Sequence, residues 1–229
     1  MINHILVGAI ATNCWILPAS AADQTGSGET ESREGVVIDP GADAPAIIAR
    51  LQRLRLRPRY IILTHGHFDH IAALPDLVDA FAGAGPVEIA IHRDDGNYLG
   101  PGAYELHRES FTAAAGNAAY VDALWKDLPS PTRLLSEGDT IGPFRVLHLS
   151  GHSPGSAGFL LEGEKILFSG DTLFKAGVGR TDLPGGDWPA LQKSLARLLA
   201  LDPAITVYPG HGPRTSIGEE QTRDNWFES

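Results

Sequence analysis

The stretch YIILTHGHFDHI, residues 60–71, places three histidines and an aspartate within six positions. Neutral imidazoles and ionised carboxylates are the nitrogen and oxygen donors that bind zinc, iron or manganese. His65 and His67 can point to the same side of an extended segment, whereas Asp69 and His70 follow about one helical turn later. This spacing, directly after an apolar strand, predicts metal ligands on a tight turn between a strand and a helix.

Three further candidate ligands lie downstream, each in a turn that follows an apolar strand. They are His152 in LSGHSPGS, Asp171 in LFSGDT and His211 in VYPGHGP. The glycines and prolines beside them let the backbone come close to an ion, and a buried carboxylate without a partner would be costly. Each residue alone is more often an ordinary turn residue than a ligand, but with the first four they complete a set of seven.

The elements that must position these residues follow from the hydrophobic pattern. Short β-branched runs that end in turn residues predict strands at 2–10, 13–19, 34–41, 59–65, 87–92, 144–150, 156–163, 165–171 and 205–212. Apolar residues at helical spacing predict helices over 44–56, 71–85 and 188–202. Pro58 is expected to end the first helix, and Pro75 to lie in the first turns of the second. Because the strands fall into two groups, we expect an α/β fold with two sheets face to face and helices outside.

Residues 93–133 mix aromatic and helical pieces without a clean strand. They are expected to form a helical insertion or lid near the active site. Their large aromatic residues either line an acyl pocket or pack in the core: Tyr98, Tyr104 and Trp125. The polar segment 20–34 is expected to be an exposed hairpin loop. No linker divides the chain, so a single domain over 1–229 is predicted.

The composition narrows the class of protein. Of the 229 residues, 43% are hydrophobic and 20% charged, as in globular proteins. The formal charge of −10 argues against nucleic acids and anionic membranes as partners, since both would repel the chain. The single cysteine, Cys14, precludes an internal disulfide and is expected to lie in the core. We see no basic leader and no apolar run near the roughly 18 residues of a membrane span, and therefore expect a cytoplasmic protein.

The order HGHFDH, GHSPGS, GD and GHG resembles that of the metallo-β-lactamase superfamily. GDTLFKAGVGRTD and PGHGPRTSIGEEQTRDNWF are similar to the type II glyoxalase-like branch, the hydroxyacylglutathione hydrolase-like proteins. The similarity extends from Asn13 to Trp226. It implies the metallo-β-lactamase fold, an αββα sandwich of two mixed sheets. It also implies two divalent ions in a groove at one edge of the sheets, zinc in the first place, with iron or manganese as alternatives.

The resemblance divides the seven candidates between these ions. The ligands of the first ion would be His65, His67 and His152. Those of the second would be Asp69, His70 and His211, with Asp171 bridging both. Two ions roughly 3.5–4 Å apart can bring the pKa of a shared water towards neutrality, so a metal-bridging hydroxide would attack a carbonyl carbon while one ion stabilises the oxyanion. Asp69 is the candidate catalytic residue, because it can orient this hydroxide.

A thiolate is a good leaving group, so we expect a small-molecule thioester resembling S-lactoylglutathione as substrate. Hydroxyacylglutathione hydrolases have a further C-terminal helical region that binds glutathione. We do not expect that region here, so the thiol stays open. Arg180 in GVGRTD can hold a substrate carboxylate, or it can pair with Asp182 and fix the loop.

Other readings use the same residues. A persulfide dioxygenase of this fold would hold a single iron through His65, His152 and Asp171. A lactonase or phosphodiesterase would use the same hydroxide, and a binding module without activity is disfavoured because all seven ligand positions are filled. Asp39 in IDPG is expected to stabilise a structural turn.

The four remaining histidines are not needed as ligands: His4, His92, His107 and His148. We expect His148 to pack or to form a hydrogen bond behind the site. His92 is expected in the core or at the surface, with substrate contact as the alternative.

Overall fold

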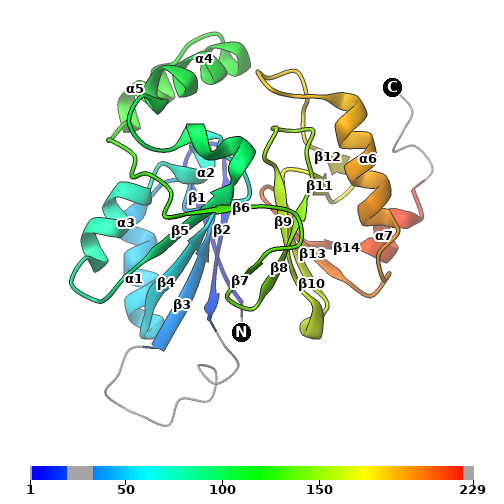
Figure 1. The fold of residues 1–229 in the computed structure, drawn as a ribbon, viewed down its shortest axis with the longest axis horizontal. Helices are drawn as coiled ribbons and strands as arrows, with labels where there is room; N and C mark the ends of the chain where they lie inside the picture. Colours follow the sequence, from blue (N-terminus) through cyan, green and yellow to red (C-terminus); the bar gives the residue numbers. More distant parts are fainter. Residues whose placement is uncertain (1, 20–32, 224–229) are drawn as a thin grey trace.

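The computed structural model describes residues 2–19 and 33–223. In this part of the chain two six-stranded sheets lie face to face, with helices on their outer sides (Figure 1). This arrangement confirms the predicted α/β sandwich. The hairpin loop expected at 20–34 lies, except for its last two residues, outside the described residues. No helix in the described ranges is both long and apolar enough to cross a membrane.

The first sheet has the order β1-β2-β3-β4-β5-β6. Its strands are β1 (Asn3–Val7), β2 (Thr12–Pro18), β3 (Arg33–Ile38), β4 (Leu56–Ile62), β5 (Glu88–His92) and β6 (Arg133–Leu135). The first three pair antiparallel, and β3 to β6 pair parallel. The carboxyl ends of the parallel strands therefore meet at one edge, where the loops after β3, β4 and β5 lie together.

The second sheet has the order β14-β13-β10-β9-β8-β7. Its strands are β7 (Thr140–Ile141), β8 (Phe144–His148), β9 (Ala157–Leu161), β10 (Ile166–Gly170), β13 (Thr206–Pro209) and β14 (Thr215–Ser216). All neighbours pair antiparallel except β10 and β13. A short hairpin of β11 (Leu173–Phe174) and β12 (Gly177–Val178) follows β10. The ends of β10 and β13 thus reach the same edge as the loops of the first sheet.

The helices of the first half are α1 (Ala44–Leu54), α2 (Phe68–Ile71), α3 (Leu74–Phe81), the 3-10 helix η2 (Arg93–Tyr98), α4 (Ala103–Ala115) and α5 (Ala119–Leu124). Those of the second half are the 3-10 helix η3 (Glu162–Glu164), α6 (Trp188–Leu199) and α7 (Ile217–Gln221). Residues 93–133 thus contain η2, α4 and α5, and α4 and α5 lie at the end of the sandwich where the sheet edges meet (Figure 1).

Two predicted helix boundaries are wrong. Pro58 does not end α1: the helix stops at Leu54 because Arg55 takes a left-handed conformation (φ 53°), and Pro58 lies inside β4. There it pairs with Gly35 at a register shift between β3 and β4, where the missing N–H of a proline is tolerated. Of the helix predicted over 71–85, only Ile71, the last residue of α2, and α3 (Leu74–Phe81) are α-helical; Pro75 lies in the first turn of α3, as predicted, where it needs no intrahelical donor.

Three apolar clusters hold these layers together. The cluster between the two sheets includes Ile38, Ile62, Phe144, Phe159 and Phe168, all fully buried. A second cluster joins α1 and α3 to the outer face of the first sheet, and a third joins α6 to the second sheet. The predicted burial of Cys14 is confirmed, since it lies in the second of these clusters, and burial raises the pKa of its thiol.

Candidate metal centre

The HGHFDH segment forms the turn that follows β4. Its first two histidines precede α2, and Asp69 and His70 lie in the single turn of that helix. Gly66 between His65 and His67 is required sterically, because a Cβ there would lie 2.4 Å from the ring of Tyr98. Burial and backbone constraint on both sides therefore fix the directions of these donors.

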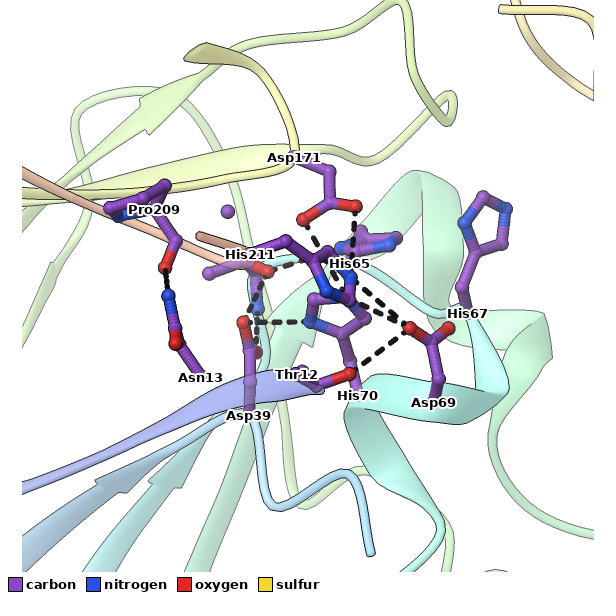
Figure 2. Close-up of polar contacts among 12 residues, drawn as sticks. Thr12, Asn13, Asp39, His65, His67, Asp69, His70, Asp171, Pro209 and His211 are labelled. Carbon is purple, nitrogen blue, oxygen red and sulfur yellow. Dashed lines mark hydrogen bonds and ion pairs between the residues drawn. The ribbon is translucent and has the colours of Figure 1, made fainter. Parts of the chain in front are cut away.

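The three downstream candidates meet this turn from the second sheet. Asp171 and His211 come from the ends of β10 and β13, and their side chains point toward Asp69 and His70 (Figure 2). The Nε2 atoms of His70 and His211 are 3.2 Å apart, and each lies 3.5 Å from an oxygen of Asp171. The structure therefore brings these predicted residues to one place.

The other half of the cluster contains His65, His67 and His152. Nδ1 of His67 lies 2.9 Å from Nε2 of His152, and that atom lies 3.7 Å from Oδ2 of Asp171. The cluster contains three groups of residues, and within each group the donor atoms lie within 4.8 Å of one another. The groups are His65, His67 and His152; His65, His70 and Asp171; and Asp69, His70 and His211. Asp171 is thus close to both halves, as a bridging ligand must be.

The donor set fits metal ions better than it fits hydrogen bonding alone. Nε2 of His65 and Oδ1 of Asp171 are buried and have no hydrogen-bond partner in the described structure. Leaving such atoms unpaired is costly, and a bound cation satisfies them. Ring nitrogens that face one another across about 3 Å are likewise compatible with ions held between them.

The electrostatics divide the histidines into two kinds. Burial, together with nearby imidazoles such as His70, holds the pKa of His65 well below the ordinary value, and burial does the same for His67. Burial opposes protonation of His70 too, but Asp69, Asp171 and a third carboxylate outweigh it and raise the pKa of His70 to about 10. Neutral imidazoles and a carboxylate-rich side therefore favour a cation between them.

That third carboxylate is Asp39, which sequence reasoning treated as a turn residue. Its Oδ2 accepts hydrogen bonds from Oγ1 of Thr64 at 2.7 Å and from Nδ1 of His70 at 3.0 Å, and its Oδ1 accepts from the Thr64 N–H. Asp39 does take a turn conformation (φ 53°). Its carboxylate also fixes the His70 tautomer, so that Nε2 faces the cluster. The sequence signal for this role of Asp39 was its position directly after a predicted strand. That strand, β3, pairs with β4, which leads into HGHFDH.

Asp95 in η2 was not singled out from the sequence. Its fully buried carboxylate accepts from Gly66 N–H at 2.9 Å, from Oγ of Ser153 at 2.7 Å and from Gly155 N–H at 2.6 Å. Burial raises the pKa of this carboxyl, and the three hydrogen bonds oppose that effect. Asp95 therefore ties the HGHFDH turn to the loop that carries His152.

The loop around Arg180 holds His152 from the other side. Nδ1 of His152 donates to the Arg180 carbonyl at 2.7 Å, which leaves Nε2 facing the cluster. The Arg180 guanidinium donates to both oxygens of Asp182, at 2.7 and 2.8 Å. The pairing alternative considered for Arg180 is therefore present, although the residue also lines the pocket beside the cluster.

The remaining candidates have structural contacts. His92 stacks on His148 with ring centroids 3.9 Å apart, and Nε2 of His148 donates to the Pro154 carbonyl. Nε2 of His107 donates to the Tyr98 carbonyl at 2.8 Å. Of the three aromatic residues considered for an acyl pocket, Tyr98 is buried, Tyr104 and Trp125 pack against the core, and none lines the pocket, whereas Phe111 of the same segment does.

The cluster opens into a pocket of about 490 Å³. Its polar end contains His67, Asp69, His152, Asp171 and His211. The rest of its wall comes from α4, the turn between β1 and β2, and the segment that begins with the β11–β12 hairpin. A small molecule that enters this pocket reaches the candidate ligands directly.

Comparison with known proteins gives the family. Residues 30–211 match the metallo-beta-lactamase superfamily. Hydroxyacylglutathione hydrolase GloC of Haemophilus influenzae is 35% identical over 221 residues, which cover 94% of this chain and 97% of that protein. The crystal structure of the BLEG-1 B3 metallo-beta-lactamase has a TM-score of 0.81 at 34% identity and covers 100% of both chains. That of TTHA1623 in a di-iron-bound form has a TM-score of 0.76 at 37% identity, over 96% of this chain and 97% of that one.

The chain therefore belongs to the metallo-β-lactamase superfamily, and the resemblance drawn from its motifs is confirmed. The family assigns the protein to the general class of metal-dependent hydrolases. The clusters of histidine and aspartate residues in this chain can bind metal ions.

Proposed function

We propose that this protein is a thioester hydrolase of the type II glyoxalase class, with a binuclear metal site. The observation that carries the proposal is the convergence of seven candidate donor residues, with Asp171 between the two halves of the cluster. The similarity to a protein named hydroxyacylglutathione hydrolase supports a thioester, in particular a substrate resembling S-lactoylglutathione.

The proposed ligands are those that the motifs indicated. One ion would be held by His65, His67 and His152. The other would be held by Asp69, His70 and His211, and Asp171 would bridge them. Zinc is the proposed metal because tetrahedral nitrogen and oxygen sites suit it, and iron is the main alternative, since a related structure is of a di-iron-bound form. When bound, two such ions lower the pKa of a water and polarise the substrate carbonyl.

The chain's own residues orient and hold the reactants. Asp69 lines the pocket, and Thr12 Oγ1 donates to its Oδ2 at 3.2 Å, so the carboxylate is held in position to accept a hydrogen bond from the attacking water and orient it. Its pKa lies well below the usual range, because His70 and His211 outweigh the effect of burial. The departing thiolate needs little protonation. Arg180 is proposed to meet a carboxylate of the thiol portion in exchange for Asp182.

The mononuclear dioxygenase reading accounts for fewer of the observations. It uses His65, His152 and Asp171, and it leaves the close approach of His70 and His211 without a role. A cytoplasmic location belongs to the proposal as well, supported by the lone cysteine and the acidic composition.

Replacement of the bridging residue tests the proposal. Asp171→Ala is expected to abolish S-lactoylglutathione hydrolysis and to lower the metal content determined by elemental analysis. Asp202→Ala is the matched control, because Asp202 is an exposed aspartate that pairs with Lys165 at 2.9 Å. Hydrolysis that survives in Asp171→Ala, with its metal retained, would contradict the bridging role.

A further inference from the structure

One wall of the pocket is apolar, although the cluster at its end is polar. The apolar wall consists of Ile10, Phe111, Ala114, Ala115, Phe174 and Val178. These residues come from the turn between β1 and β2, from α4, and from the β11–β12 hairpin. They face the same space as Asp69 and His152, so a ligand whose reactive group lies at the cluster also lies against this wall.

The wall has the properties of a surface that a ligand covers. Ile10 is 43% exposed, and it is one of four large hydrophobic residues in the described chain that are at least 40% exposed. On α4 the side chains at Ala114 and Ala115 are single methyl groups, which leave the space in front of them open. A pocket of about 490 Å³ has the size of a small-molecule site and exceeds what a three-carbon lactoyl group fills.

The charges in the pocket exclude a strongly anionic occupant at this wall. The one guanidinium among the lining residues belongs to Arg180, which is not part of the apolar wall and donates to both oxygens of Asp182. The α4 part of the wall offers only the hydroxyl of Ser110 as a polar side chain. An anionic group placed there would lose water without gaining a partner, whereas an apolar group gains by burial.

We propose that the apolar wall binds the acyl portion of the thioester, and that this portion is a hydrocarbon chain longer than the lactoyl group. The inference rests on the proposed thioester hydrolysis and adds the class of acyl group. Ala114 is then a specificity-determining residue, since its small side chain sets how far the chain can extend along α4.

Acyl thioesters of one uncharged thiol, N-acetylcysteamine, test the proposal. From acetyl to hexanoyl, kcat/KM of the metal-loaded protein is expected to rise about fourfold for each methylene that the wall covers. Ala114→Phe should lower the ratio of hexanoyl to acetyl kcat/KM by at least about tenfold. Ala113→Phe is the matched control, because Ala113 lies on the outer surface of α4 with Glu105 and Thr112 and should keep the ratio. A wild-type ratio near one, or an equal effect of both variants, would overturn the proposal.

A second measurement separates this inference from the hydrolase proposal. The S-hexyl thioether of N-acetylcysteamine cannot be hydrolysed, and its binding can be followed by calorimetry. Wild type and Ala113→Phe are expected to bind it more tightly than the S-methyl analogue, and Ala114→Phe is expected to lose that difference. If the thioethers bind with these differences but no thioester is cleaved, the hydrolase proposal fails and the apolar binding site stands. If thioesters are cleaved without any preference for the hexanoyl group, only the assignment of the wall to the acyl portion fails.

Discussion

Replacement of Asp95 by asparagine tests whether a buried carboxylate outside the ligand set holds the candidate metal centre together. Asp95 is fully buried and accepts from the N–H groups of Gly66 and Gly155 and from the Ser153 hydroxyl. Asparagine has nearly the same shape but replaces one oxygen by an NH2 group. The substitution therefore changes the hydrogen bonding of the two ligand loops while it keeps their packing.

The size of the effect on stability depends on which of the three hydrogen-bond donors to Asp95 loses its acceptor. With the remaining oxygen toward Gly155, the new NH2 group can donate to Ser153, whose hydroxyl can turn to Ser156, 2.8 Å away. Gly66 N–H then stays buried without an acceptor, and the loss is about 2–3 kcal/mol of the free energy of unfolding. Misplacement of the loops should also weaken metal binding by about 10- to 100-fold.

Urea unfolding of the metal-free protein measures the loss of free energy of unfolding, and competition with a chromophoric chelator measures the change in metal affinity. Asp94→Asn is the matched control, because Asp94 is the neighbouring aspartate and its side chain is 49% exposed. Its change should stay within about 0.5 kcal/mol. A free energy of unfolding and a metal affinity for Asp95→Asn that match those of Asp94→Asn would show that the Asp95 carboxylate does not hold the two loops together.

Three further predictions concern the same region. Asp39→Asn should weaken metal binding by about 10- to 100-fold, because the carboxylate that fixes Nδ1 of His70 is lost; an unchanged affinity in chelator competition would be the contrary result. Burial lowers the pKa of His107 to about 4, so as the pH falls from about 6.5 to 4 the unfolded chain takes up a proton that the folded chain does not. The free energy of unfolding should therefore fall by about 3 kcal/mol over this range, and His107→Gln, which keeps a donor for the Tyr98 carbonyl, should lack this part of the pH dependence. Equal pH slopes for the two proteins would disprove it. Removal of metal with a chelator should lower the midpoint of thermal unfolding, since an ion at about a hundred times its Kd contributes about 2.7 kcal/mol; equal midpoints would speak against a bound metal.

Local signals in the sequence were sufficient to predict the strand ends and the candidate ligands that lie together there. HGHFDH could be predicted because its donors are adjacent in the chain, and His152, Asp171 and His211 because each follows an apolar strand in a glycine turn. β10 and β13 run parallel, so Asp171 and His211 at their ends meet at one edge, whereas their approach to the HGHFDH turn depends on how the two sheets pack.

The residues that position the ligands were harder to find. Asp95 binds groups that lie 29, 58 and 60 residues away in the chain, so no local pattern marks it. The end of α1 depends on one residue, Arg55, in a left-handed conformation that its residue type does not indicate. The loop that carries Arg180 lines the pocket and also contains Asp182, so the sequence is compatible with either partner for the guanidinium. Only the three-dimensional contacts show that the pair with Asp182 forms.

The proposed function requires two ions, together with the residues around Asp171, for the hydrolysis of a thioester. Its most direct test is to add metal stepwise to the metal-free protein while thioester hydrolysis and dissolved oxygen are recorded together. Hydrolysis is expected to rise to a maximum at two equivalents of metal per chain, with no oxygen consumed. A maximum at one equivalent of iron, accompanied by oxygen uptake on glutathione persulfide and no thioester hydrolysis, would contradict it.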